Sequence, residues 1–156
     1  MKVSRRHGRL RLRLETEEAT LMSMLLDELD TLLEGPADSD DDVLTRLYPA
    51  AYRDDPEAEV EFRSLTESSL RTARSERIAT CRADLAGGPD IDLSDADAGR
   101  RWIQVLNDLR LALGTRLGIT EDDEPDFDPT DPGAQPRVVY YWLTAVQDSV
   151  VQGLMG

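Results

Sequence analysis

Apolar residues recur every three or four positions over long stretches of this chain, and this spacing predicts amphipathic α-helices. The clearest stripe follows a helix-start pattern at Ser94-Asp-Ala-Asp97 and ends before Gly118. Its members are Ala98, Trp102, Val105, Leu106, Leu109, Leu113 and Leu117. Similar stripes occupy residues 16–34 and 136–154. We therefore expect a mainly α fold, a helical bundle of about five helices.

The segment that follows Pro56 also has helical spacing, but its apolar face shifts by about one residue near the middle. Ser64-Leu-Thr-Glu67 has the spacing of a capping box, a pattern found at helix starts. We therefore favour two helices, over residues 56–63 and 65–86, rather than one long bent helix. A single amphipathic turn is expected at residues 43–48.

The first fourteen residues contain a strict alternation of basic and apolar side chains. Residues 9–14 read Arg-Leu-Arg-Leu-Arg-Leu, which places three leucines on one face of a strand and three arginines on the other. His7-Gly8 can form a tight turn, with residues 3–6 as the partner strand. We therefore predict a small N-terminal β-hairpin within residues 1–14, docked on helices through its leucine face because an isolated hairpin is only marginally stable.

The length of 156 residues fits one helical domain, residues 1–156, interrupted by acidic loops at residues 36–42 and 119–135. The first helix is expected to be capped by Thr16. No apolar stretch is long enough to cross a membrane, and no secretory signal is recognisable. A cytoplasmic location without membrane contact is therefore expected.

Histidine and cysteine are almost absent, which removes most catalytic and metal-binding arrangements. The chain has one of each, His7 and Cys81, so it can form neither an intramolecular disulfide nor a multi-cysteine zinc site. The acidic run Asp38–Asp42 lacks the glycine and the glutamate of a calcium loop. We therefore expect no catalytic residue, no metal and no cofactor. Cys81 is interpreted as a small apolar side chain on a helix face rather than a reactive thiol.

Charge is unevenly distributed along the chain. The formal net charge is −14, yet six of the 18 basic residues and no acidic residue lie in the first fourteen positions. The arginine face of the predicted strand, formed by Arg9, Arg11 and Arg13, can neutralise the chain's own acidic body, bind an acidic protein, or contact nucleic-acid phosphates. We favour an acidic protein surface, its own or a partner's, because the rest of the chain repels nucleic acid.

A second candidate site borders the longest apolar stripe. Asn107, Arg110 and Gly114 lie at positions i, i+3 and i+7, along one flank of the predicted helix. The glycine permits close approach of another helix, and the two polar side chains can bond a neighbouring backbone or carboxylate. We expect Asn107 and Arg110 to be buried in a polar network that fixes helix register, with a ligand site as the alternative.

A third candidate surface is the segment with two tyrosines. Arg46, Tyr48, Tyr52 and Arg53 belong to the residue types most common at binding hot spots, so they can enter a groove of a partner protein. The alternative, equally favoured, is that the tyrosines pack on the core.

Four runs of residues together resemble an actinobacterial family that is known as a domain of unknown function and is often encoded beside the ClpS protease adaptor. They are Arg46-Leu-Tyr-Pro-Ala-Ala-Tyr-Arg-Asp-Asp-Pro56, Glu61-Phe-Arg-Ser-Leu-Thr-Glu67, Leu106-Asn-Asp-Leu-Arg-Leu-Ala-Leu-Gly-Thr-Arg-Leu-Gly118 and Trp142-Leu-Thr. Some members are described as actinomycete oxidative-stress regulators, AosR-like proteins acting on transcription with an extracytoplasmic-function sigma factor. The resemblance implies a regulator. A redox switch in that family would use a pair of cysteines, which this chain lacks.

These observations lead to one favoured function and one alternative. The favoured function is a non-enzymatic regulatory or adaptor protein that recognises a protein partner, either a sigma factor or another acidic protein. The alternative is a transcriptional regulator that binds DNA directly through the basic hairpin. The sequence leaves homodimer formation open.

Overall fold

The computed structural model describes residues 1–35, 42–48, 54–120 and 134–156, and these ranges form five helices and three short strands. The strands are β1 (Lys2–Arg6), β2 (Arg9–Arg13) and β3 (Asp90–Asp92). The helices are α1 (Thr16–Leu33), α2 (Asp42–Leu47), α3 (Pro56–Ala86), α4 (Ala96–Leu117) and α5 (Ala134–Met155). The prediction of a mainly α fold with a small N-terminal hairpin is confirmed.

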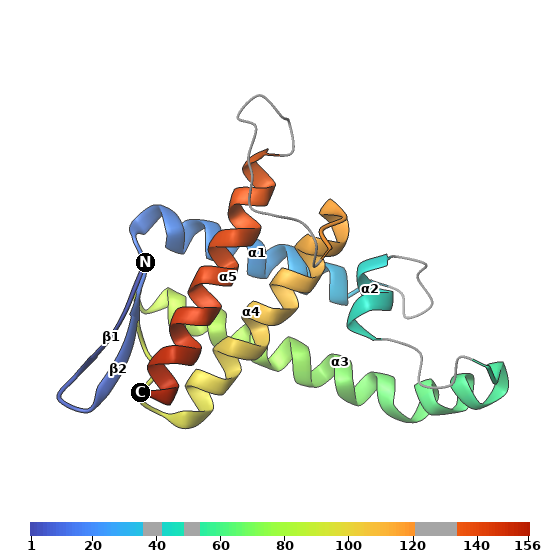
Figure 1. Cartoon of the computed structure of the whole chain (residues 1–156). Helices are drawn as coiled ribbons and strands as arrows, with labels where there is room; N and C mark the ends of the chain where they lie inside the picture. Colours follow the sequence, from blue (N-terminus) through green and yellow to red (C-terminus); the bar gives the residue numbers. More distant parts are fainter. Residues whose placement is uncertain (36–41, 49–53, 121–133) are drawn as a thin grey trace.

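Helix α4 is the centre of the bundle and contacts each of the other four helices. Figure 1 shows α4 and α5 side by side, with the hairpin at one end of the molecule. The predicted α4 stripe supplies much of the core, including fully buried Trp102, Val105 and Leu106. The partner positions in the core come from α1, α3 and α5 and include Met22, Leu26, Ile78, Leu143, Val146 and Val150.

The hairpin has the predicted strands and turn. Arg6 pairs with Arg9, and the two turn residues His7 and Gly8 both have positive φ, as the favoured two-residue hairpin turn requires. Its leucine face is buried, with Leu10 and Leu12 at most 2% exposed. That face packs on α5, where a Cβ atom at Gly153 would lie 2.9 Å from Leu10 Cδ1. A side chain larger than hydrogen at this position would push α5 away from the hairpin.

The third strand was not predicted from the sequence. β3 pairs antiparallel with β2, opposite Arg11–Arg13, and gives the sheet order β1-β2-β3. Ile91 points into the core while the flanking Asp90 and Asp92 face outward. Three residues are too few for the alternation to stand out, and pairing with β2 decides that they are a strand.

The prediction of two helices between residues 56 and 86 is wrong, because α3 is continuous. The Ser64 hydroxyl donates to the carbonyl of Glu61 at 2.7 Å instead of capping a new helix. The apolar face shifts because the first half of α3 extends beyond the bundle (Figure 1). Val60 and Leu65 there are 69% and 76% exposed, so contacts with the core do not set their spacing.

Smaller differences concern the helix ends. Glu15, not Thr16, is the N-cap of α1, and its N–H donates to the Glu18 carboxylate at 2.9 Å. The predicted acidic loops at 36–42 and 119–135 are each shorter by their last residues, because Asp42 begins α2 and Ala134 begins α5. Residues 36–41 and 121–133 of the predicted loops lie outside the described ranges.

None of the helices within the described ranges is both long enough and apolar enough to span a bilayer.

Candidate functional site

The most distinctive surface is the outer face of the hairpin, which gathers five basic residues on two adjacent strands. The register places Lys2 opposite Arg13, Ser4 opposite Arg11 and Arg6 opposite Arg9. Alternation sends the leucines of β2 inward, so these six side chains share the opposite face. We call this surface the basic sheet face and define it by Lys2, Arg6, Arg9, Arg11 and Arg13.

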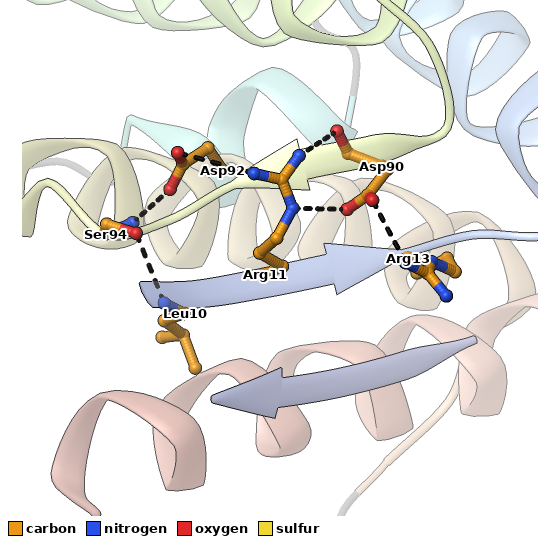
Figure 2. Close-up of polar contacts among 6 residues, drawn as sticks. All are labelled: Leu10, Arg11, Arg13, Asp90, Asp92 and Ser94. Atoms are coloured by element: carbon orange, nitrogen blue, oxygen red, sulfur yellow. Dashed lines mark hydrogen bonds and ion pairs between the residues drawn. The ribbon is translucent and has the colours of Figure 1, made fainter. Parts of the chain in front are cut away.

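One edge of the basic sheet face is neutralised by β3. Arg11 Nε lies 2.8 Å from Asp90 Oδ1, and Arg11 Nη1 lies 3.5 Å from Asp92 Oδ2. Arg13 Nη2 is 3.2 Å from Asp90 Oδ2 (Figure 2). The prediction that this arginine face meets an acidic protein surface is therefore confirmed for Arg11 and Arg13, and the surface is the chain's own.

Backbone and hydroxyl contacts hold β3 in place beside these ion pairs. The N–H of Leu10 donates to Ser94 Oγ at 3.2 Å, and the N–H of Ser94 donates to Asp92 Oδ1 at 2.9 Å. The Ser94 hydrogen bonds, with the nearby arginines, lower the pKa of Asp92 below its ordinary value. Hydrogen bonding to Arg11 likewise lowers the pKa of Asp90, although partial burial opposes the shift.

Replacing Arg11 by Gln should return the pKa of Asp90 toward its ordinary value of 3.8. A lowered carboxyl pKa means that these contacts contribute stability above the unfolded-state pKa and lose it as the pH falls through the folded-state pKa. Carboxyl-carbon NMR titration of the parent and the R11Q variant measures both midpoints. An unchanged Asp90 midpoint would show that the Arg11 contact does not exist in solution.

A second cluster joins the end of α2 to α3, and we call it the tyrosine clamp. Two guanidinium groups lie over the ring of Tyr48, that of Arg74 at 4.5 Å and that of Arg71 at 5.7 Å from its centroid. Arg71 Nη1 also donates to the carbonyls of Leu33 and Gly35 at 2.6 and 2.8 Å. These carbonyls end α1, where a cation is favoured by the helix dipole.

Arg74 makes the deepest connection of the tyrosine clamp. Its Nη1 donates to the carbonyl of Leu47 at 2.9 Å, and its Nε lies 3.2 Å from Oδ2 of Asp108 on α4. Asp108 is 5% exposed, and this burial raises its pKa against the opposing effects of Arg74 and Arg77. One guanidinium therefore ties together α2, α3 and α4.

Of the four residues of the predicted tyrosine surface, the structure describes Arg46 and Tyr48, and only Tyr48 belongs to the tyrosine clamp. Tyr48 is buried and packs on the core, which was the alternative interpretation. Arg46 is exposed on α2. Tyr52 and Arg53 lie outside the described residues.

The predicted polar network on α4 is correct for Arg110 and wrong for Asn107. Arg110 Nε donates to the hydroxyl of Thr144 at 3.0 Å, and its Nη1 donates to Oε1 of buried Gln147 on α5. Asn107 is exposed, and its neighbour Asp108 is the buried polar residue. The helix rotates by about 100° per residue, so a shift of one position exchanges a buried flank for an exposed one.

Gly114 has the predicted role. It is buried, and a Cβ atom there would lie 3.0 Å from Cε2 of Tyr140 on α5. The absence of a side chain therefore allows α4 and α5 to approach closely. Arg110 lies 5.7 Å from the centroid of the same ring, so the polar contacts and the close approach form one helix interface.

Replacing Arg110 by Ala should lower the free energy of unfolding by about 1–3 kcal/mol, because Oε1 of the buried Gln147 would lose its hydrogen-bond donor. Replacing Asn107 by Ala should change it by less than about 0.5 kcal/mol, as is usual for exposed positions. Urea denaturation of both variants measures the difference. Equal losses would restore Asn107 as a buried member of the network.

Cys81 is fully buried on the core side of α3. Burial and the nearby Asp84 raise the pKa of its thiol to about 12, with smaller opposing effects from Arg101 and Arg77. The thiolate is the reactive form of cysteine. The geometry therefore agrees with the interpretation of Cys81 as an apolar core residue.

At pH 8, a thiol reagent should label Cys81 in the native protein at least about 100-fold more slowly than in the urea-unfolded chain. Burial and the raised pKa both lower the fraction of reactive thiolate. With an aromatic disulfide as the reagent, the absorbance of the thiolate that it releases measures the rate of the reaction. Rapid labelling in the native state would show that Cys81 is accessible and place it among the candidates for oxidation.

Metal-binding side chains do not gather in the part of the chain that the structure describes. In those ranges no cluster of three or more His, Cys, Asp or Glu residues could hold a metal ion. A hollow of about 350 Å³ lies between α1 and α4, but leucines form most of its walls, with Glu28 and Arg116 as its charged residues. It includes neither Asn107 nor Arg110.

The acidic partners Asp90, Asp92 and Asp108 and the connecting Arg74 were not predicted from the sequence. The short alternation Asp90-Ile-Asp92 was the available signal for the first two. For Asp108 and Arg74 no local signal exists, because their importance comes from the contact between α3 and α4.

Comparison with known proteins places these features in a family. A family model described as "Domain of unknown function (DUF2017)" matches residues 1–154. The chain is 32% identical over 160 residues to the protein named "Oxidative stress regulator AosR" from Mycobacterium bovis, and equally to the protein of that name from Mycobacterium tuberculosis. Each match covers 92% of this chain and 72% of the relative. No solved structure matches the chain significantly.

Proposed function

This chain belongs to the DUF2017 family of domains of unknown function, and we propose that it is a non-enzymatic regulator of the oxidative stress response that recognises another protein. The mycobacterial relatives are named as oxidative stress regulators, and that name supports the regulatory part of the proposal. Recognition of a protein partner is our inference from the surface of the chain.

The basic sheet face is the observation that carries the proposal. It places five cations on one small sheet of a chain whose formal net charge is −14. Arg11 and Arg13 form ion pairs with Asp90 and Asp92, while the side chains of Lys2, Arg6 and Arg9 are exposed. An isolated basic surface on an acidic protein steers the approach of an acidic partner and fixes its orientation.

We propose that the partner is an extracytoplasmic-function sigma factor and that the chain regulates transcription in the cytoplasm through it. The family resemblance supplies this candidate, and an acidic surface on the sigma factor would complement the basic sheet face. An acidic protein of another kind would satisfy the same charge requirement.

In vitro transcription with purified RNA polymerase tests this proposal. Each extracytoplasmic-function sigma factor of the host is assayed with and without the chain, and the transcript yield is measured. We expect one sigma factor to respond, and we expect Arg9→Glu to reduce that response. Arg100→Glu is the matched control, because it makes the same charge change at an exposed position on α4.

No response with any sigma factor would contradict the proposed partner. Sedimentation of the same protein samples, alone and with the responding sigma factor, reports whether the chain forms a homodimer.

Direct DNA binding is the second candidate function, and the arrangement of cations on a two-stranded ribbon favours it. Two of the five cations are already paired with carboxylates, and the acidic body repels a duplex. We therefore expect weak binding without sequence preference at about 0.15 M salt, where screening is near physiological. Sub-micromolar, sequence-selective binding that Arg9→Glu abolishes would establish the DNA-binding function instead.

A further inference from the structure

Strand β1 is the edge of the sheet. It pairs with β2 on one side, and within the described ranges no strand pairs with its other side. In a hairpin with a two-residue turn, Arg6 and Arg9 form a hydrogen-bonded pair, and such pairs alternate along the strands. The backbone N–H and C=O groups of Val3 and Arg5 therefore point to the free edge, where they can bind another strand.

The free edge lies beside the unneutralised part of the basic sheet face. Lys2 and Arg6 are exposed on β1, and a hollow of about 170 Å³ between them is lined by Lys2, Ser4, Arg6 and Arg13. A carboxylate carried by an added strand would enter this hollow. The same strand would turn its alternate, apolar side chains toward Val3, which is half-buried against α5.

The opposite edge of the sheet already holds a strand with this pattern. β3 reads Asp90-Ile91-Asp92. Its two outward carboxylates contact the arginines of β2 (Figure 2). Its isoleucine is buried in the core. Two of the three outward positions of β1 are cations, Lys2 and Arg6, with Ser4 between them, so its outward face carries part of the charge pattern of β2. The chain thus contains its own example of the strand that fits.

We propose that β1 binds an acidic strand of a partner protein in which acidic and apolar residues alternate, so that the partner extends the sheet. This inference rests on the proposed function and names the kind of segment that the partner contributes. A second copy of β1 does not fit, because its cations would face those of the first. Nucleic acid fits less well, because phosphate accepts hydrogen bonds from N–H groups but donates none to the free carbonyls.

Titration of the full ¹⁵N-labelled chain with a blocked peptide, Gly-Asp-Ile-Asp-Ile-Asp-Gly, tests the proposal. We expect the amides of Val3 and Arg5 to shift and to gain protection from hydrogen exchange. Arg6→Glu should weaken binding about 10-fold or more, as expected for a close charge pair, whereas Arg100→Glu should change it less than about 2-fold. Hydrogen exchange of the Arg11 amide, which lies in a hydrogen-bonded pair with Ser4, reports whether each variant keeps the pairing of β1 with β2.

A second peptide separates strand addition from simple charge attraction. Methylation of alternate backbone nitrogens keeps every charge but removes the hydrogen bonds to β1, so this peptide should lose binding. Equal affinity of the methylated peptide, no binding of the parent peptide at millimolar concentration, or displacement of the peptide by duplex DNA at lower concentration would each overturn the proposal. None of these outcomes decides the transcription assay, so the two proposals fail separately.

Discussion

Replacing Arg74 by methionine should lower the free energy of unfolding by about 3–5 kcal/mol, the usual cost of removing one partner from a buried ion pair. The reason is that Asp108 would remain as an unpaired carboxylate that is 5% exposed. The same change removes the hydrogen bond to the carbonyl of Leu47 and the contact with the Tyr48 ring. Guanidinium denaturation at about pH 7 measures the loss.

The pH dependence identifies the cause of this loss. Burial already raises the pKa of Asp108, and removal of Arg74 should raise it further. A carboxyl group with a raised folded-state pKa favours folding below its unfolded-state pKa and loses that contribution as the pH rises through the folded-state pKa. The deficit of Arg74→Met relative to the parent should therefore be full near neutral pH and smaller at about pH 5.

Two further variants serve as controls for Arg74→Met. Arg82→Met removes another arginine of α3 whose ion pairs, with Asp27 and Asp30, are more exposed. It should cost less than about 1 kcal/mol. The double variant Arg74→Met, Asp108→Leu should recover much of the lost stability, because it no longer buries a charge. A pH-independent deficit without such recovery would mean that Asp108 is not the source of the loss.

Replacing Trp102 by Ala should lower the free energy of unfolding by a similar amount, about 3–5 kcal/mol, because a fully buried indole would leave a cavity. Trp102 is the second residue of the α4 stripe, and its Nε1 donates to Asp84 Oδ2 on α3 at 2.9 Å. The variant therefore loses both packing and a hydrogen bond between helices. Chemical denaturation followed by circular dichroism measures the change.

Trp102→Phe separates the two contributions. It keeps most of the buried apolar surface but removes the donor to Asp84, so a loss of about 1–2 kcal/mol is expected. Trp142→Phe is a matched control, since Trp142 also donates to a carboxylate, that of Glu18, but is only half-buried. A Trp102→Ala variant that unfolds at the parent's denaturant concentration would show that the core is centred elsewhere.

Local patterns were sufficient for most of the secondary structure. The strict alternation in residues 9–14 could only form a half-buried strand, and the seven apolar positions of α4 could only form one stripe on a helix. Both patterns depend on backbone geometry alone, so no knowledge of neighbouring elements was needed. The role of Gly114 was predictable for the same reason, because a glycine beside an apolar stripe permits close helix contact.

The candidate site was only partly predictable. The basic face of β2 followed from alternation, but the identity of its acidic partner depended on β3, a strand of three residues that forms only against β2. The burial of Asp108, where burial of Asn107 was predicted, shows the same dependence on tertiary contacts. Both residues border the α4 stripe, and the position of Arg74 on α3 determines which flank is buried.

The sequence by itself determined the helical periods, the hairpin and the separation of a basic first segment from an acidic body. The tertiary structure alone decided that α3 continues through an apparent break, that Asp90 and Asp92 neutralise two of the arginines, and that Arg74 pairs with Asp108. The physical reason is range. Periodicity and turn chemistry act within a few residues, whereas these contacts join residues between 34 and 81 positions apart and exist only after the helices have packed.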